Sequence, residues 1–141
     1  MRMLELRKFI IMLDEMSVLI RFRATRTRDL IDELSKQENL SNFVFLNLLT
    51  DFMDMEDDIN ISWKTAASRT LFLTRSDKDI LIGVGEQIGS TDVDGQLSML
   101  ELSRMLAEKN LNQAEDEYRT KGRMLRTVWM LCGLAAGIMV I

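Results

Sequence analysis

The chain has 141 residues, a length that suits one domain, and it combines no Pro and seven Gly with many Leu, Met, Arg, Glu and Asp, which favours helices over a many-stranded fold. Its net charge of -4 argues against a general nucleic-acid-binding protein, because such a protein needs a basic surface to neutralise phosphates. No His is present, which excludes the Ser-His-Asp triad, Cys-His catalysis and histidine-ligated zinc in their usual forms.

Apolar residues recur at intervals of three and four along most of the chain, which predicts a series of amphipathic helices. The predicted helices cover residues 2–22, 28–38, 42–58, 63–73 and 76–88, and a long last helix runs from residue 93 into the C-terminal tail. Candidate N-caps are Thr27 for the second helix, Asn60 or Ser62 for the fourth, and Thr74 or Ser76 for the fifth. We therefore expect an all-α fold, a six-helix bundle of antiparallel helices.

Several residues are expected to organise the core of this bundle. Trp63 is a large apolar anchor, and Gly85 in the middle of a helix indicates close contact with another helix. In the first helix, Leu4, Ile11 and Val18 are expected to widen the apolar face formed by Met3, Leu6, Ile10, Leu13, Ser17 and Ile20. The last helix carries a heptad stripe of Val93, Leu97, Leu100, Ala107, Leu111, Ala114 and Tyr118, which suits packing on the preceding helix.

The tail, residues 127–141, carries no charge and follows a basic stretch containing Arg119, Lys121, Arg123 and Arg126. Positive charge next to an apolar segment marks the cytoplasmic side of a membrane. The apolar run is shorter than the ~20 residues that a helical span needs. This short length has three explanations: either the native chain continues beyond residue 141, or the segment lies at the membrane interface, or the tail is part of the hydrophobic core. We expect a helical cytoplasmic domain at residues 1–123 and an incomplete C-terminal membrane segment at residues 124–141. The single cysteine, Cys132, can form no internal disulfide, which fits a reducing, cytoplasmic setting.

Two charged clusters are the candidate partner-binding residues. The basic cluster consists of Arg21, Arg23, Arg26 and Arg28. The acidic run consists of Asp51, Asp54, Glu56, Asp57 and Asp58, at the predicted C-terminal end of the third helix. Carboxylates at that position face the negative end of the helix dipole, so the run calls for a basic partner or nearby arginines. Plain solvation is the alternative for both clusters.

The turn before the last helix allows two interpretations. With Ser90 as position one, Asp92, Asp94, Gly95 and Glu101 fall at positions three, five, six and twelve of an EF-hand calcium loop. Ser90 stands where the first ligand should be Asp, and no second such loop exists in the sequence. The favoured alternative makes Thr91 or Asp92 an N-cap and Asp94 a first-turn partner of the helix dipole, so no metal is predicted.

The same turn and the tail resemble the stage III sporulation protein AB family. That family has a helix ending in Gly-x-x-Leu-Gly, a Ser/Thr-Asp step, a Gln four residues on, and a basic stretch before a C-terminal membrane segment. Here those places hold Gly85, Ile88, Gly89, Thr91, Asp92 and Gln96, followed by the basic stretch Lys121, Arg123 and Arg126. Residues 13–30 and Trp63 agree more loosely. Departures are Arg26 for an expected Pro, Trp129 for a membrane Gly, and the lack of the family's first membrane segment before Met1.

The resemblance implies a component of the apparatus that joins mother cell and forespore during endospore formation. Its cytoplasmic domain would be similar to that of type II secretion and type IV pilus platform proteins, the F family. The protein would lie in the mother-cell membrane around the forespore and face the cytoplasm. It would couple a secretion-type ATPase to channel proteins, with no enzymatic activity, catalytic residues or cofactor of its own. Self-association into a homo-oligomer stays open.

Two functions from other classes remain as alternatives. The EF-hand spacing would give a calcium-responsive helical sensor, and the apolar tail would also suit a tail-anchored helical adaptor unrelated to sporulation. No 34-residue repeat of the tetratricopeptide type supports the second alternative.

Overall fold

The computed structural model describes residues 2–23, 26–89 and 92–140, with side chains for all of these except residues 23, 129 and 132–140. This part of the chain forms six α-helices and one 3₁₀ turn without any strand, which confirms the predicted all-α class. The elements are α1 (Arg2–Arg23), α2 (Thr27–Ser35), η1 (Glu38–Leu40), α3 (Val44–Met55), α4 (Ile59–Arg69), α5 (Arg75–Gln87) and α6 (Val93–Val140). They form two compact units, Met1–Leu111 (unit 1) and Asn112–Ile141 (unit 2), and α6 contributes to both.

Capping residues set several of the helix ends. Thr74 caps α5 as predicted, because its hydroxyl accepts from the Asp77 backbone N–H while the Asp77 carboxylate accepts from the Thr74 backbone N–H. The predicted caps of α2 and α4 were wrong. Thr27 lies inside α2, after an Arg26 whose side chain makes no capping bond. α4 begins at Ile59, earlier than predicted, because Asp58 caps it.

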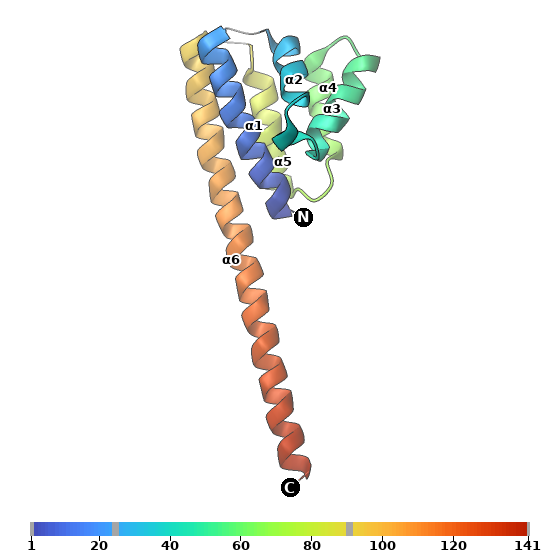
Figure 1. Ribbon diagram of the computed structural model, residues 1–141, viewed down its shortest axis with the longest axis vertical. Helices are drawn as coiled ribbons and strands as arrows, with labels where there is room; N and C mark the ends of the chain where they lie inside the picture. The colour runs from blue at the N-terminus through green and yellow to red at the C-terminus, as the bar shows by residue number, and fades with distance from the viewer. Residues whose placement is uncertain (1, 24–25, 90–91, 141) are drawn as a thin grey trace. The chain divides into compact units, whose positions relative to one another are not determined.

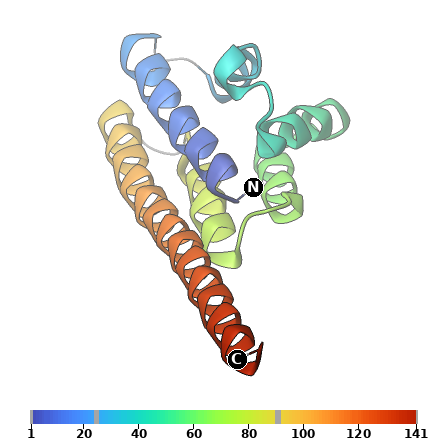
Figure 2. The same ribbon diagram turned by 60° about the horizontal axis from the view of Figure 1, so that its bottom comes forward.

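The helices of unit 1 alternate in direction along the chain (Figure 1). α1 and α5 run in the same direction: they begin side by side, where Arg2 bonds Asp77, and end side by side, where Gly89 lies next to Thr27. The reason is topological, since alternating directions along α1 to α5 return the fifth helix to the direction of the first. The part of α6 in unit 1 runs opposite to both, and it lies beside α1 in Figures 1 and 2. The shared direction of α1 and α5 therefore follows from the antiparallel order of consecutive helices and does not contradict it (Figure 1).

Trp63 and Gly85 form the centre of the α4–α5 contact. The Trp63 side chain is 1% exposed, its Nε1–H donates to the Leu81 carbonyl oxygen at 2.8 Å, and the Phe45 ring meets it edge-on. A methyl group added at Gly85 would overlap the Trp63 ring. Only glycine therefore lets the two helices approach this closely, which confirms both the core role of Trp63 and the close contact at Gly85.

The buried faces of α1 and α6 differ in part from the predicted ones. On α1, Leu4 and Val18 are exposed, and the buried face widens on its other side, through Phe9, Met12, Met16 and Leu19. On the unit 1 part of α6, Leu100 and Ala107 are buried as predicted, but polar Ser103 and Asn110 complete the stripe. The predicted stripe instead had Leu111 at the level of Asn110, and Leu111 is half-buried. At the start of the stripe, Val93 is exposed and Leu97 half-buried.

Unit 2 is the C-terminal part of α6, and it contains the predicted membrane segment at residues 124–141. Among its described side chains, Met124, Leu125 and Val128 are exposed. The side chains of residues 132–140, Cys132 among them, and residue 141 lie outside the described part. Over the residues that the structure describes, no helix has an apolar stretch long enough to cross a membrane. The membrane segment therefore stays a prediction.

Candidate partner-binding face

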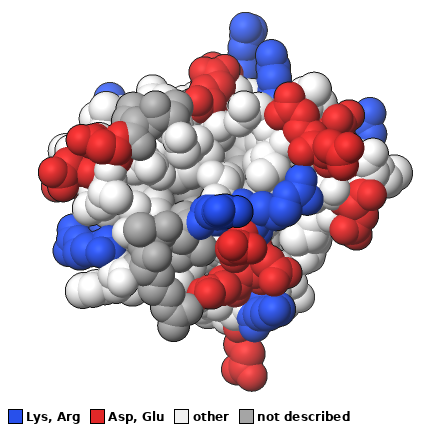
Figure 3. Space-filling model, turned by 90° about the horizontal axis from the view of Figure 1, so that it is seen from above, with Lys and Arg blue, Asp and Glu red and all other residues white. Residues whose placement is uncertain are grey.

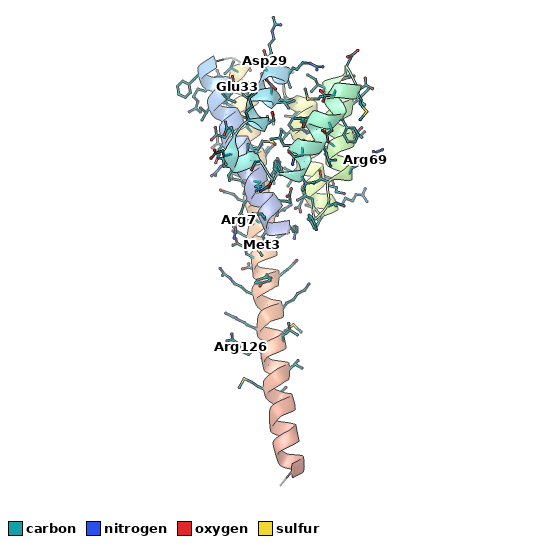
Figure 4. The ribbon with its side chains drawn as sticks, turned by 45° about the vertical axis from the view of Figure 1, so that its right-hand side comes forward. Met3, Arg7, Asp29, Glu33, Arg69 and Arg126 are labelled. Carbon is teal, nitrogen blue, oxygen red and sulfur yellow. The ribbon has the colours of Figure 1, made fainter. Side chains whose placement is uncertain are left out.

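Members of both predicted charged clusters meet at a groove of about 330 Å³ between α2 and α3. We call it the α2–α3 groove. It is lined by Arg28, Asp29, Ile31 and Asp32 of α2 and by Thr50, Met53 and Asp54 of α3. Figure 4 shows Asp29 near the end of unit 1 at which α2 begins. Three carboxylates against one guanidinium make the walls of this groove predominantly acidic.

Local contacts anchor the walls of the groove. Ile31 is buried beneath it, so α2 is fixed to the core directly behind the charged residues. The Arg28 guanidinium donates to the Asp57 carbonyl oxygen at 3.0 Å, which connects the first turn of α2 to the α3–α4 connection. Asp32 pairs with Lys36 at 3.3 Å, and both side chains are well exposed. Such exposed pairs add little stability, which leaves their charges available to a partner.

The acidic run was predicted at the C-terminal end of one helix, but the structure divides it between two helices and the connection that joins them. α3 ends at Met55, and the last acid of the run belongs to the next helix: the Asp58 carboxylate accepts from the Asn60 backbone N–H at 2.9 Å. There it meets the positive end of the α4 dipole, which stabilises the helix. Glu56 accepts from the Asp58 backbone N–H at 3.3 Å. Asp51 and Asp57 are exposed.

The arginines of the basic cluster do not form one patch. Arg28 lines the α2–α3 groove, whereas Arg21 lines a second groove, of about 540 Å³, with Asp94, Glu101 and Arg104 of α6. Arg26 is exposed before α2, and the Arg23 side chain lies outside the described part of the chain. Figure 3 views this end of unit 1, where basic and acidic side chains surround an uncharged area.

A buried polar cluster, which sequence reasoning missed, lies at the opposite end of unit 1. The Asp77 carboxylate is 0% exposed and accepts from the Arg2 guanidinium at 2.8 Å and from the Asn110 amide at 2.7 Å. Together with the Thr74 cap, these residues form what we call the Asp77 cluster. It ties the start of α1, the start of α5 and the unit 1 part of α6 together. Burial alone would raise the pKa of Asp77, but the hydrogen bonds from Arg2, Thr74 and Asn110 and the Arg2 charge lower that pKa below its usual value.

A second buried carboxylate, Glu5, was also missed. Its Oε2 accepts from the Val44 backbone N–H, at the first residue of α3, at 3.3 Å. Phe43 at the N-cap position makes no side-chain capping bond, so Glu5 takes over the capping role from another helix. Burial raises the pKa of Glu5, and this outweighs the Val44 bond and the nearby Lys8 charge. No local motif predicts such a long-range cap.

In the part that the structure describes, the residues of the turn between α5 and α6 end one helix and cap the next. Gly89 has a φ of 76°, a left-handed conformation that suits glycine after a helix, and its N–H donates to the Gln96 side chain at 3.3 Å. Asp92 accepts from the Gly95 backbone N–H at 2.9 Å, as the capping interpretation predicts. Ser90 and Thr91 lie outside the described residues. α6 begins at Val93, so Asp94 and Glu101 lie along a helix and not around a calcium loop.

Comparison with known proteins decides between the remaining interpretations. The family model described as stage III sporulation protein AB matches residues 1–141. The chain belongs to that family. Its Gly85, Gly89, Asp92 and Gln96, which carried the resemblance, are thus the residues that shape the α4–α5 contact and the α5–α6 turn.

A solved structure with a similar fold supports the helical fold described for this chain. The structure described as "Stage III sporulation protein AB (SpoIIIAB)" is similar with a TM-score of 0.61 at 19% sequence identity, covering 81% of this chain and 93% of that chain. A search of curated protein sequences gives no match. Family membership supports a role in sporulation.

Proposed function

We propose that this family member is a membrane-attached adaptor, or platform, of the channel apparatus that joins mother cell and forespore, and that it acts through protein contacts and not as an enzyme. The observation that carries this proposal is the match of the stage III sporulation protein AB model over residues 1–141. The apolar tail and the basic residues before it support attachment to the mother-cell membrane, with unit 1 in the cytoplasm.

The α2–α3 groove is the surface that we assign to the main partner, a secretion-type ATPase. Its carboxylates, Asp29, Asp32 and Asp54, suit a basic segment of that partner, and Met53 adds an adaptable apolar contact between them. Channel subunits of the apparatus would bind other surfaces of unit 1.

Charge reversal tests the groove. The variant Asp29→Lys with Asp54→Lys should lose ATPase capture from sporulating cells and should fail to restore sporulation in a strain that lacks the native protein. The control, Asp79→Lys with Glu86→Lys, makes the same change in net charge at two exposed positions of α5. Equal capture by both variants, with normal helicity, would remove the groove from the proposed interface.

A further inference from the structure

The connection between α4 and α5 presents two large apolar side chains to solvent. Leu71 is 64% exposed and Phe72 is 52% exposed, and they are consecutive residues of one short turn. We call it the Leu71–Phe72 turn. The exposed part of these side chains adds nothing to stability, because apolar surface contributes only where it is buried. Their placement therefore calls for an explanation outside the core.

The backbone of this turn is also strained. Phe72 has a φ of 73°, a left-handed conformation that is unfavourable for a bulky residue with a Cβ. Glycine or asparagine would adopt it at lower cost, as Gly89 does in the α5–α6 turn. Strained residues of this kind concentrate at sites of function, where the side chain is worth more than the strain.

The position of the turn is fixed by the Asp77 cluster. Thr74 caps α5 directly after the turn, and Asp77, one turn into α5, bonds Arg2 and Asn110. The turn thus lies at the end of unit 1 where α1 begins, as Figure 1 shows. Asn110 is next to the last residue of unit 1. From Asn110 the chain has nine residues to Arg119, the start of the basic stretch.

The charged residues around the turn are basic. Arg69 and Arg75 flank it, and Lys78 follows in the first turn of α5, where its ammonium donates to the Ser68 carbonyl oxygen at 3.0 Å. Figure 4 shows Arg69 at the outer side of α4, where its guanidinium lies 5.3 Å from the centre of the Phe52 ring. Between Arg69 and Lys78 the one acid is Asp77, which is buried and paired with Arg2. The residue after Lys78, Asp79, is exposed.

We propose that the Leu71–Phe72 turn is a lipid contact, which inserts its two side chains into the headgroup region of an anionic phospholipid membrane. Aromatic and aliphatic tips flanked by Arg and Lys are the chemistry that interfacial membrane contacts use. The proposal rests on the membrane attachment proposed above and adds a second point of contact. That contact would limit rotation of unit 1 about its tether and so orient the α2–α3 groove.

An environment-sensitive probe on the full chain tests this contact. The chain has one native cysteine, so Cys132→Ser with Leu71→Cys gives a single labelling site for the fluorophore NBD. The labelled protein is reconstituted in vesicles of phosphatidylcholine with phosphatidylglycerol, or of phosphatidylcholine alone. With the anionic lipid we expect a severalfold rise in NBD emission and its quenching by brominated lipid.

Phe22→Cys in the same background is the matched control, because Phe22 is 76% exposed at the opposite end of unit 1. Its probe should stay in water in both vesicles. If the probes at positions 71 and 22 respond alike, the lipid contact is wrong. It is equally wrong if the probe at 71 becomes apolar without lipid as protein concentration rises, since a second copy then covers the turn. Flotation of the unlabelled chain separates the two proposals: a chain that does not float with vesicles overturns the membrane attachment itself.

Discussion

The two ends of unit 1 use the same kinds of side chain in opposite ways. At the end where α1 begins, Asp77 is buried and satisfied by Arg2, Thr74 and Asn110. At the other end, Asp54 and its neighbours line an open groove and stay in water. A buried carboxylate must be paired, because an unpaired one costs several kcal/mol, whereas an exposed one carries no such obligation.

This difference separates folding from docking. The residues of the Asp77 cluster are committed to one another and hold three helices in register. Those of the α2–α3 groove are anchored through Ile31 beneath them and through the Arg28 contact with the Asp57 carbonyl. Substitutions at the first end should change stability, and substitutions at the second should change binding.

Asp77→Ala is the variant with the largest expected effect. It leaves the Arg2 guanidinium and the Asn110 amide without their shared acceptor, and it removes the reciprocal cap with Thr74. We expect it to lower the free energy of unfolding by about 3 kcal/mol, the low end for breaking a buried pair, because Arg2 keeps some access to water. Urea denaturation followed by circular dichroism measures this.

Asp54→Ala serves as the matched control in the same experiment. Asp54 is exposed, so its replacement should change the free energy of unfolding by less than about 0.5 kcal/mol. Comparable losses in the two variants would show that the acidic groove also supports the fold, and the separation between the two ends would fail.

We expect pH to have a smaller effect on the free energy of unfolding. The contributions of Asp77 and Glu5 to this effect have opposite signs. The lowered pKa of Asp77 gives stability that is present above about pH 4, its unfolded value, and is lost as pH falls through the folded pKa. The raised pKa of Glu5 has the opposite effect on stability. The folded protein becomes more stable as pH falls through the folded pKa of Glu5 toward its unfolded value of about 4.3.

Two neutral variants separate these contributions. Asp77→Asn should be less stable than the native protein at pH 7, and the difference should shrink as pH falls below about 4 and through the folded pKa of Asp77. Glu5→Gln should lack the gain in stability on mild acidification. Thermal unfolding measured from pH 7 to pH 3 gives both curves, and parallel curves for Asp77→Asn and the native protein would contradict the assignment at Asp77.

Much of the fold followed from local patterns in the sequence. The six helices, the Thr74 cap, the core position of Trp63 and the glycine contact at Gly85 all depend on spacing or on one residue type, and all are confirmed. The contact between α1 and α5 was not predicted, because helix periodicity does not say which helices are neighbours. The polar stripe on α6, with Asn110 buried against Asp77, was missed because hydropathy ranks asparagine as exposed.

The candidate site was predictable only as a set of residues. The charge pattern named Arg28 and Asp54 but could not show that α2 and α3 place them in one groove, or that Arg21 faces α6 in another. Asp58 was assigned to the wrong helix because the break between α3 and α4 carries no Gly or Pro to mark it. The contacts that decide these positions join residues far apart in the chain.

The smallest expected effect concerns the Leu71–Phe72 turn, at the same end as the Asp77 cluster but exposed. Phe72→Gly should raise the free energy of unfolding by about 0.5 kcal/mol, because it removes the left-handed strain, worth about 1–2 kcal/mol, and adds less than that in unfolded-state entropy. Phe22→Gly, near the C-terminal end of α1, should instead destabilise by about 0.5 kcal/mol, because glycine is the poorer helix former. Differential scanning calorimetry compares the two. A gain in stability at Phe72, together with lower emission from a probe at position 71, would mean that the strained turn is kept for contact and not for folding. Destabilisation at Phe72 would place that side chain among the residues that hold the fold.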